Sequence, residues 1–64
     1  MKIRDLKKGS YFTFRPIEEP QEKQVWVRGD YDRSLKKYSV YKFSDTNWEI
    51  FVKGNKECYI DFTF

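Results

Sequence analysis

The chain has 64 residues and a mass of 7.9 kDa, so it holds one domain, and a domain this short buries only about 60% of its unfolded surface. It carries a formal net charge of +3, no histidine and one cysteine, Cys58, which excludes an internal disulfide, a Cys/His zinc site and Cys/His catalysis. Aromatic residues make up 20% of the chain and alanine is absent. This composition favours β structure over helix or disorder.

Residues 1–8 are charged from Lys2 onward and contain no apolar stretch of signal-peptide length. No segment approaches the roughly 18 apolar residues that a membrane span needs. We therefore expect a soluble, cytoplasmic protein with no membrane partner. The alternation around Ile3 is typical of a short edge strand or an extended arm, which leads to a turn at residues 8–10.

Residues 11–15 alternate, with Phe12 and Phe14 on one face, which predicts a half-buried strand. Residues 16–20 begin and end with proline and hold two acids, so they predict an exposed loop. A second strand is predicted over residues 23–28, with the valines on one face and the tryptophan on the other.

Residues 30–36 are polar and rich in turn formers, which predicts a loop, and residues 37–43 alternate again as a third strand. We expect the second and third strands to pair with Val27 opposite Tyr38. The two faces of the third strand have similar apolar content, so the sequence leaves open which one points inward. Residues 44–47 predict a further turn, because Asp, Asn, Ser and Thr side chains bond to their own backbone.

Residues 48–62 predict a β-hairpin. A two-residue loop at residues 54–55 would oppose apolar to charged side chains across the pair. A three-residue loop at residues 54–56 opposes apolar residues on one face and sets Lys53 against Glu57 on the other, so we prefer it. This register predicts a strained, left-handed residue within the loop.

Short antiparallel strands separated by turns predict an all-β fold, a small five-stranded antiparallel SH3-like barrel. An OB-fold fits less well, because it usually has more residues and a helix. The expected core comprises the apolar, inward-facing positions Phe12, Phe14, Val25, Val27, Val40, Trp48, Ile50, Val52, Cys58, Ile60 and Phe62.

The run VWVRGDYDRS, followed by KKY and the ending YIDFTF, resembles a family of small uncharacterised bacterial proteins of similar length. That family has no assigned function, so the resemblance implies no activity. The segment DLKKGSY at residues 5–11 is similar to the start of the first strand in SH3-like barrels of translation-associated proteins related to elongation factor P. This second likeness bears on the fold alone.

Basic and aromatic residues coincide in residues 25–43, which hold five basic and two acidic side chains. Lys and Arg neutralise phosphates and exposed rings stack on bases, so this segment predicts a surface for single-stranded nucleic acid. The predicted nucleic-acid-binding residues are Arg28, Arg33, Lys36, Lys37, Lys42, Trp26, Tyr31, Tyr38 and Tyr41. The same residues also fit an ordinary solvated surface.

A protein or peptide partner is the alternative, held in an aromatic groove formed by Trp26 and residues 16–20, or on an exposed strand edge. We expect a monomer or weak dimer. No nucleophile has an adjacent base and no glycine-rich phosphate loop is present, so we expect no catalysis, no cofactor and no metal site. The tripeptide Arg28-Gly29-Asp30 is interpreted as a turn that ends the second strand.

Overall fold

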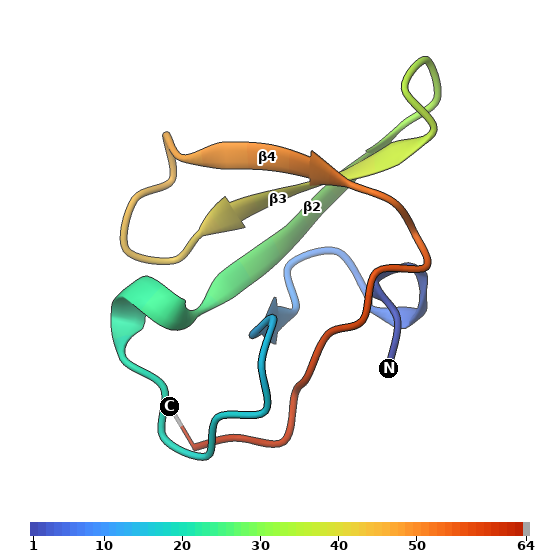
Figure 1. Ribbon diagram of the computed structural model, residues 1–64. Coiled ribbons are helices and arrows are strands. Elements are labelled where there is room, and N and C mark those ends of the chain that lie inside the picture. Colours follow the sequence, from blue (N-terminus) through green and yellow to red (C-terminus); the bar gives the residue numbers. More distant parts are fainter. Residues whose placement is uncertain (64) are drawn as a thin grey trace.

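The computed structural model describes residues 1–63 and consists of one open antiparallel sheet with the strand order β1-β2-β3-β4 (Figure 1). Two single 3-10 turns accompany it. In chain order the elements are η1 (Ile3–Asp5), β1 (Tyr11–Phe12), η2 (Glu22–Gln24), β2 (Trp26–Asp32), β3 (Lys37–Lys42) and β4 (Glu49–Val52). The prediction of an all-β antiparallel fold is confirmed. The closed five-stranded barrel is wrong, since the sheet has four strands and stays open.

The predicted C-terminal hairpin over residues 48–62 is also wrong. The chain turns at residues 54–55, but β4 pairs with β3, and the segment after the turn leaves the sheet. That segment meets the N-terminal part of the chain through isolated bridges from Glu57 and Tyr59. There it covers the core and buries Cys58 completely.

The core lies between one face of the sheet and the two terminal segments, which run beneath it in Figure 1. Its buried cluster consists of Ile3, Leu6, Phe12, Val40 and Cys58. Among the predicted core residues, those found buried are Phe12, Val25, Val27, Val40 and Cys58; those half-buried are Phe14, Val52 and Phe62; those exposed are Trp48, Ile50 and Ile60. The exposed ones were predicted inside because the hairpin was expected to fold over the core.

The β2–β3 pairing differs from the predicted register. Val27 lies opposite Tyr41, and the register then shifts so that Tyr31 lies opposite Tyr38. The shift is a β-bulge, which adds one residue to β2 between Arg28 and Tyr31. The strand therefore continues through the Arg-Gly-Asp tripeptide to its last residue, and no turn occurs there.

Glycine is required at the bulge because β3 lies directly against it. A Cβ atom on Gly29 would sit 3.1 Å from both the backbone oxygen and the Oγ of Ser39. Ser39 is itself buried, so it has little room to yield. The close approach holds the two strands together where their register changes.

The two predicted turns are formed by aspartate side chains. Asp32 Oδ1 accepts hydrogen bonds from the backbone N–H groups of Ser34 (2.8 Å) and Leu35 (3.1 Å), and this bends the β2–β3 hairpin. Asp45 Oδ1 accepts one from the N–H of Asn47, which confirms the turn predicted over residues 44–47. The left-handed residue predicted within residues 54–56 is not there; Lys36, with φ of 55°, is the non-glycine residue with positive φ among residues 1–63.

The third strand turns its Val40 face toward the core. Tyr38 packs against the core cluster on that face, whereas Tyr41 lies on the opposite face of the sheet. The alternative that the sequence left open is thereby settled in favour of residues 38, 40 and 42.

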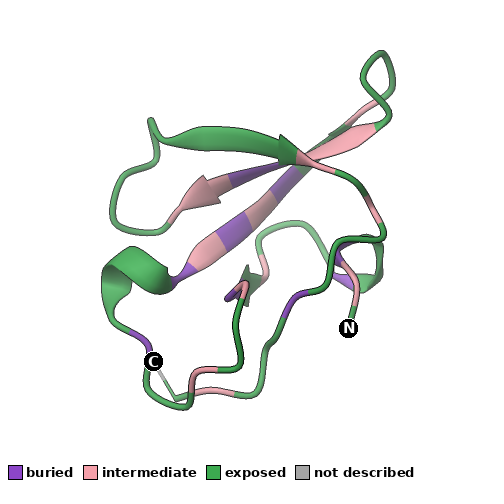
Figure 2. Cartoon of the chain, viewed as in Figure 1, coloured by how far each residue is buried: buried purple, intermediate pink, exposed green. Residues whose placement is uncertain are grey.

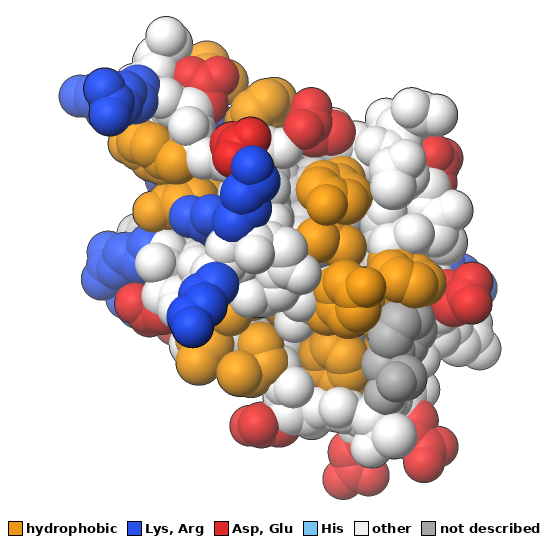
Figure 3. Space-filling model, turned by 180° about the vertical axis from the view of Figure 1, so that it is seen from behind, with side chains coloured by type: hydrophobic (Ala, Val, Ile, Leu, Met, Phe, Trp, Pro, Cys, Tyr) orange, Lys and Arg blue, Asp and Glu red, His pale blue; other side chains and the backbone are white. Residues whose placement is uncertain are grey.

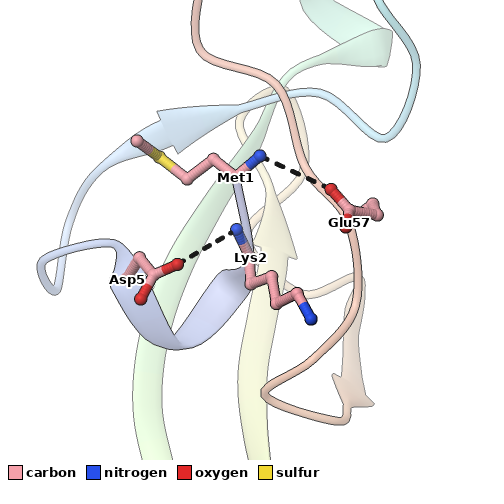
Figure 4. A network of polar contacts seen from close by, with 4 residues as sticks. All are labelled: Met1, Lys2, Asp5 and Glu57. Carbon is pink, nitrogen blue, oxygen red and sulfur yellow. Dashed lines mark hydrogen bonds and ion pairs between the residues drawn. The ribbon is translucent and has the colours of Figure 1, made fainter.

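The N-terminal turn is tied to the C-terminal segment at its exposed side (Figure 4). The Met1 ammonium lies 3.4 Å from Glu57 Oε2, and the backbone N–H of Lys2 donates to Asp5 Oδ2. The backbone adds a further bond, from the N–H of Cys58 to the oxygen of Met1 at 2.8 Å. Residues 1–8 are therefore neither an edge strand nor a free arm, but a 3-10 turn packed on the tail.

Candidate nucleic-acid interface

A groove of about 500 Å³ opens beside the β2–β3 hairpin, at the end of the sheet where the turn after β4 meets the N-terminal turn. Its volume falls in the range of ordinary ligand sites. It is lined by Arg4, Tyr31, Leu35, Lys36, Lys37, Tyr38, Lys53, Gly54 and Asn55. Three separate stretches of the chain thus supply its walls.

The bulge in β2 places the two tyrosines side by side. Side chains alternate between faces along a strand, so without the extra residue Tyr31 would lie on the face opposite Tyr38. With it, the two rings are 4.8 Å apart between centroids at an interplanar angle of 57°. Tyr31 remains 45% exposed, so its ring is open to a ligand.

Arg28 supports the Tyr38 ring from within the sheet. Its guanidinium carbon lies 4.4 Å from the ring centroid, a cation–π distance. Its Nε is buried and has no hydrogen-bond partner in residues 1–63. The Tyr38 ring thus contacts both a cation and a second aromatic ring, which holds it in place.

The far wall of the groove comes from η1 and the turn after β4. The backbone N–H of Arg4 donates to the oxygen of Gly54 at 3.0 Å, which fixes these two segments together. A Cβ atom on Gly54 would lie 3.0 Å from the Tyr38 ring and 3.3 Å from the Arg4 side chain. A larger residue here would require the Tyr38 ring or the Arg4 side chain to shift, and the neighbouring Lys53 lines the groove with the tyrosines.

The lining carries four cations, on Arg4, Lys36, Lys37 and Lys53, and no acid. Within residues 1–63 none of the four belongs to an ion pair; the pairs found there join Met1 to Glu57 and Lys8 to Asp30. Figure 3 shows most of the Lys and Arg side chains of its face gathered on the side of the hairpin, next to hydrophobic side chains. Such a groove attracts anions, since no ion pair among the described residues holds its four cations.

The structure brings together some of the predicted site residues and separates the others. Tyr31, Lys36, Lys37 and Tyr38 line the groove, and Arg28 lies against Tyr38. Arg33 is exposed in the hairpin turn, outside the lining.

The remaining predicted residues lie elsewhere on the sheet. Lys42 Nζ sits over the rings of Trp48 (4.1 Å) and Trp26 (5.6 Å) at the opposite end of the hairpin. Tyr41 lines a hollow on the other face of the sheet, together with Tyr11 and Val27.

Sequence reasoning missed Arg4 and Lys53 as members of the site. Lys53 was expected to pair with Glu57 across the hairpin, but Glu57 instead meets the ammonium of Met1. Arg4 is brought in by the packing of the N-terminal turn on the tail, which leaves no local pattern in the sequence. The net charge of +4 over residues 1–15 was the only hint.

The aromatic groove expected beside the proline-rich loop exists as a smaller hollow of about 210 Å³. Trp26 is half-buried there, with its ring 5.3 Å from that of Phe14 between centroids. Arg15, Ile17 and Gln24 complete the lining. A single cation lines this hollow, against four in the groove.

Residues outside these hollows offer little chemistry. Burial raises the pKa of the Cys58 thiol, so it stays protonated at neutral pH and packs as a small core side chain. In the described part of the chain no three His, Cys, Asp or Glu side chains are grouped as metal ligands. The same residues contain no helix with the length and apolar character to cross a membrane.

Comparison with protein families, curated proteins and solved structures finds no match to this chain.

Proposed function

We propose that this protein binds single-stranded nucleic acid in the groove beside the β2–β3 hairpin. The observation that carries the proposal is a groove lined by four unpaired cations, no acid and two adjacent tyrosine rings. Phosphates meet the cations, and a base stacks on the exposed ring of Tyr31. A single strand suits the site better than a duplex, because stacking needs bases that are already unpaired.

The test is an amide chemical-shift titration with a mixed single-stranded oligonucleotide pool at low and near-physiological salt. We expect shifts confined to residues that line or adjoin the groove. Four phosphate contacts predict that log K falls against log salt with a slope of about −3, since each contact on a single strand contributes about −0.7. Absence of shifts at low salt would overturn the proposal.

A matched pair of variants separates groove binding from general charge attraction. Lys36→Glu/Lys37→Glu reverses two groove cations, and Lys7→Glu/Lys23→Glu reverses two exposed lysines outside the lining. Both doubles change the net charge from +3 to −1. We expect the first to weaken binding by roughly tenfold or more beyond the second. Equal losses in the two doubles would contradict a site at the groove.

Peptide binding in the hollow formed by Phe14 and Trp26 is the second candidate, because this hollow presents a half-buried indole beside the proline-rich loop. An apolar peptide held there would bind with little salt dependence. Trp26→Ala would then abolish peptide binding and leave oligonucleotide binding at the groove intact. A salt-sensitive interaction that survives Trp26→Ala would support the groove over the hollow.

A further inference from the structure

The two edges of the sheet differ in whether another segment of the chain pairs with them. At the β1 edge the chain continues into Thr13, which is buried and bonds in both directions with Tyr59 of the tail. At the other edge, no segment within residues 1–63 pairs with the outer side of β4. Figure 2 shows β4 exposed along most of its length, whereas β2 and β3 carry buried residues.

The outer side of β4 presents unpaired backbone groups. The N–H of Lys42 donates to the oxygen of Trp48 at 3.1 Å, so the carbonyl of Trp48 points toward β3. Hydrogen-bonding direction alternates along an antiparallel strand, so Ile50 also bonds inward, while Glu49 and Phe51 direct their backbone groups outward. None of the backbone bonds to segments outside the sheet involves either residue in the described chain.

This edge is four residues long and begins with a charged residue, but it lacks other features that usually prevent strand association. Glu49–Val52 contains no proline, no lysine and no bulge. Its apolar side chains are open on both faces, with Ile50 37% and Phe51 41% exposed. An open edge with exposed apolar side chains favours addition of another strand.

We propose that β4 pairs antiparallel with β4 of a second copy of this chain, with Phe51 opposite Phe51 of the partner subunit, so that the two sheets become one. In this register Ile50 lies opposite Val52 of the partner subunit, and Glu49 lies opposite Lys53 of the partner subunit. Apolar side chains meet on one face, aromatic rings on the other, and opposite charges at both ends. The Phe51 pair lies on the two-fold axis, and the symmetry repeats the other two pairs twice.

The neighbouring register is less favourable. Placing Ile50 opposite Ile50 of the partner subunit sets Glu49 against Phe51 of the partner subunit and leaves its charge without a counterion. Registers that differ by one residue would oppose residues of different faces, so they are excluded. Of these registers, the one with Phe51 on the axis is the one that pairs Glu49 with a cation.

Sedimentation velocity over a concentration series tests the dimer. Lys53 also lines the groove, so the experiment contains no nucleic acid and its result is independent of the proposed function. Glu49→Lys and Lys53→Glu should each weaken the dimer about tenfold, because both symmetry-related charge pairs become repulsive. The double variant Glu49→Lys/Lys53→Glu keeps the net charge and should return the affinity to within about threefold of the original.

The rescue matters because Glu49 also accepts a hydrogen bond from the Oγ of Ser39, which the single variant loses. The double variant loses the same bond, so recovered association reports the charge pair and not the fold. A chain that sediments as a monomer at every concentration, or a double variant as weak as Glu49→Lys, would overturn the proposal.

A cysteine at position 51 tests directly whether the two copies pair with residue 51 opposite residue 51 of the partner subunit. Hydrogen-bonded antiparallel partners have Cα atoms about 5.5 Å apart, which suits a disulfide. Phe51→Cys should therefore form a covalent dimer under mild oxidation, faster than Glu19→Cys at an exposed site away from β4. The native Cys58 is buried and contributes little to either. Equal rates for the two variants would contradict the pairing.

Discussion

The two ends of the β2–β3 hairpin carry the same kinds of residue but use them differently. At the turn end, Lys36 and Lys37 line the groove without an ion pair or ring contact within residues 1–63. At the other end, Lys42 is held over the indole of Trp48 at 4.1 Å. The pattern of basic and aromatic residues in the sequence predicts a binding site equally at both ends. What distinguishes a site is whether its cations remain available after folding.

The largest expected effect comes from removing the anchor of the turn end, Ile3. Its side chain is fully buried, and the adjacent backbone bonds hold Arg4 against Gly54. Ile3→Ala should cost about 2 to 5 kcal/mol, as much as a core this small supplies in total. Thermal unfolding followed by circular dichroism should show a largely unfolded chain at room temperature. Leu35→Ala, which truncates an exposed side chain of the groove, is the control and should change the midpoint little.

A folded Ile3→Ala with an unchanged midpoint would mean that η1 contributes little to the core.

Local features of the fold follow from the sequence, whereas the choice of strand partner does not. The turn at Asp45 and the third strand at residues 37–43 rest on neighbouring residues, and the structure has both, with the strand ending one residue earlier. In the sequence, residues 48–62 allow a hairpin register that opposes apolar side chains on one face. In the structure of residues 1–63, β4 pairs with β3 alone, and the tail crosses to the core, where Cys58 is buried in one cluster with Ile3. That competition is decided by tertiary packing, which alternation does not record.

The second effect in size tests the bulge that distinguishes the turn end. Gly29→Ala places a methyl group 3.1 Å from the backbone of Ser39, and such overpacking costs about 1 to 3 kcal/mol. We expect a lower midpoint and loss of the ring–ring contact between Tyr31 and Tyr38 in nuclear Overhauser spectra. The control is Asp30→Ala, which removes only an exposed ion pair with Lys8 and should cost at most about 1 kcal/mol. Equal stability of the two variants would show that β3 can yield at the bulge.

The same bulge explains how far the site could be read from the sequence. Tyr31, Lys36, Lys37 and Tyr38 are close in the chain, so a hairpin brings them together in almost any register. The side of the sheet on which Tyr31 lies depends on one extra residue that alternation does not reveal. Lys53 could not be assigned to the site from the sequence, because its expected partner, Glu57, forms an ion pair with the Met1 ammonium instead. The sequence predicts which hairpin residues lie close together, but it does not predict which of the cations remain without an ion pair.

The smallest expected effect sharpens the contrast between the two ends. Lys37→Ala removes a groove cation, so the salt slope of oligonucleotide binding should become shallower by about 0.7. Lys42→Ala should leave that slope unchanged and instead lower the free energy of unfolding by about 0.5 to 1 kcal/mol, because its ammonium contacts the Trp48 ring. Tryptophan fluorescence should change in the second variant alone. If Lys42→Ala reduced the slope as much as Lys37→Ala does, the indole end would belong to the binding surface, and a nucleic acid would have to run along the whole hairpin to touch both.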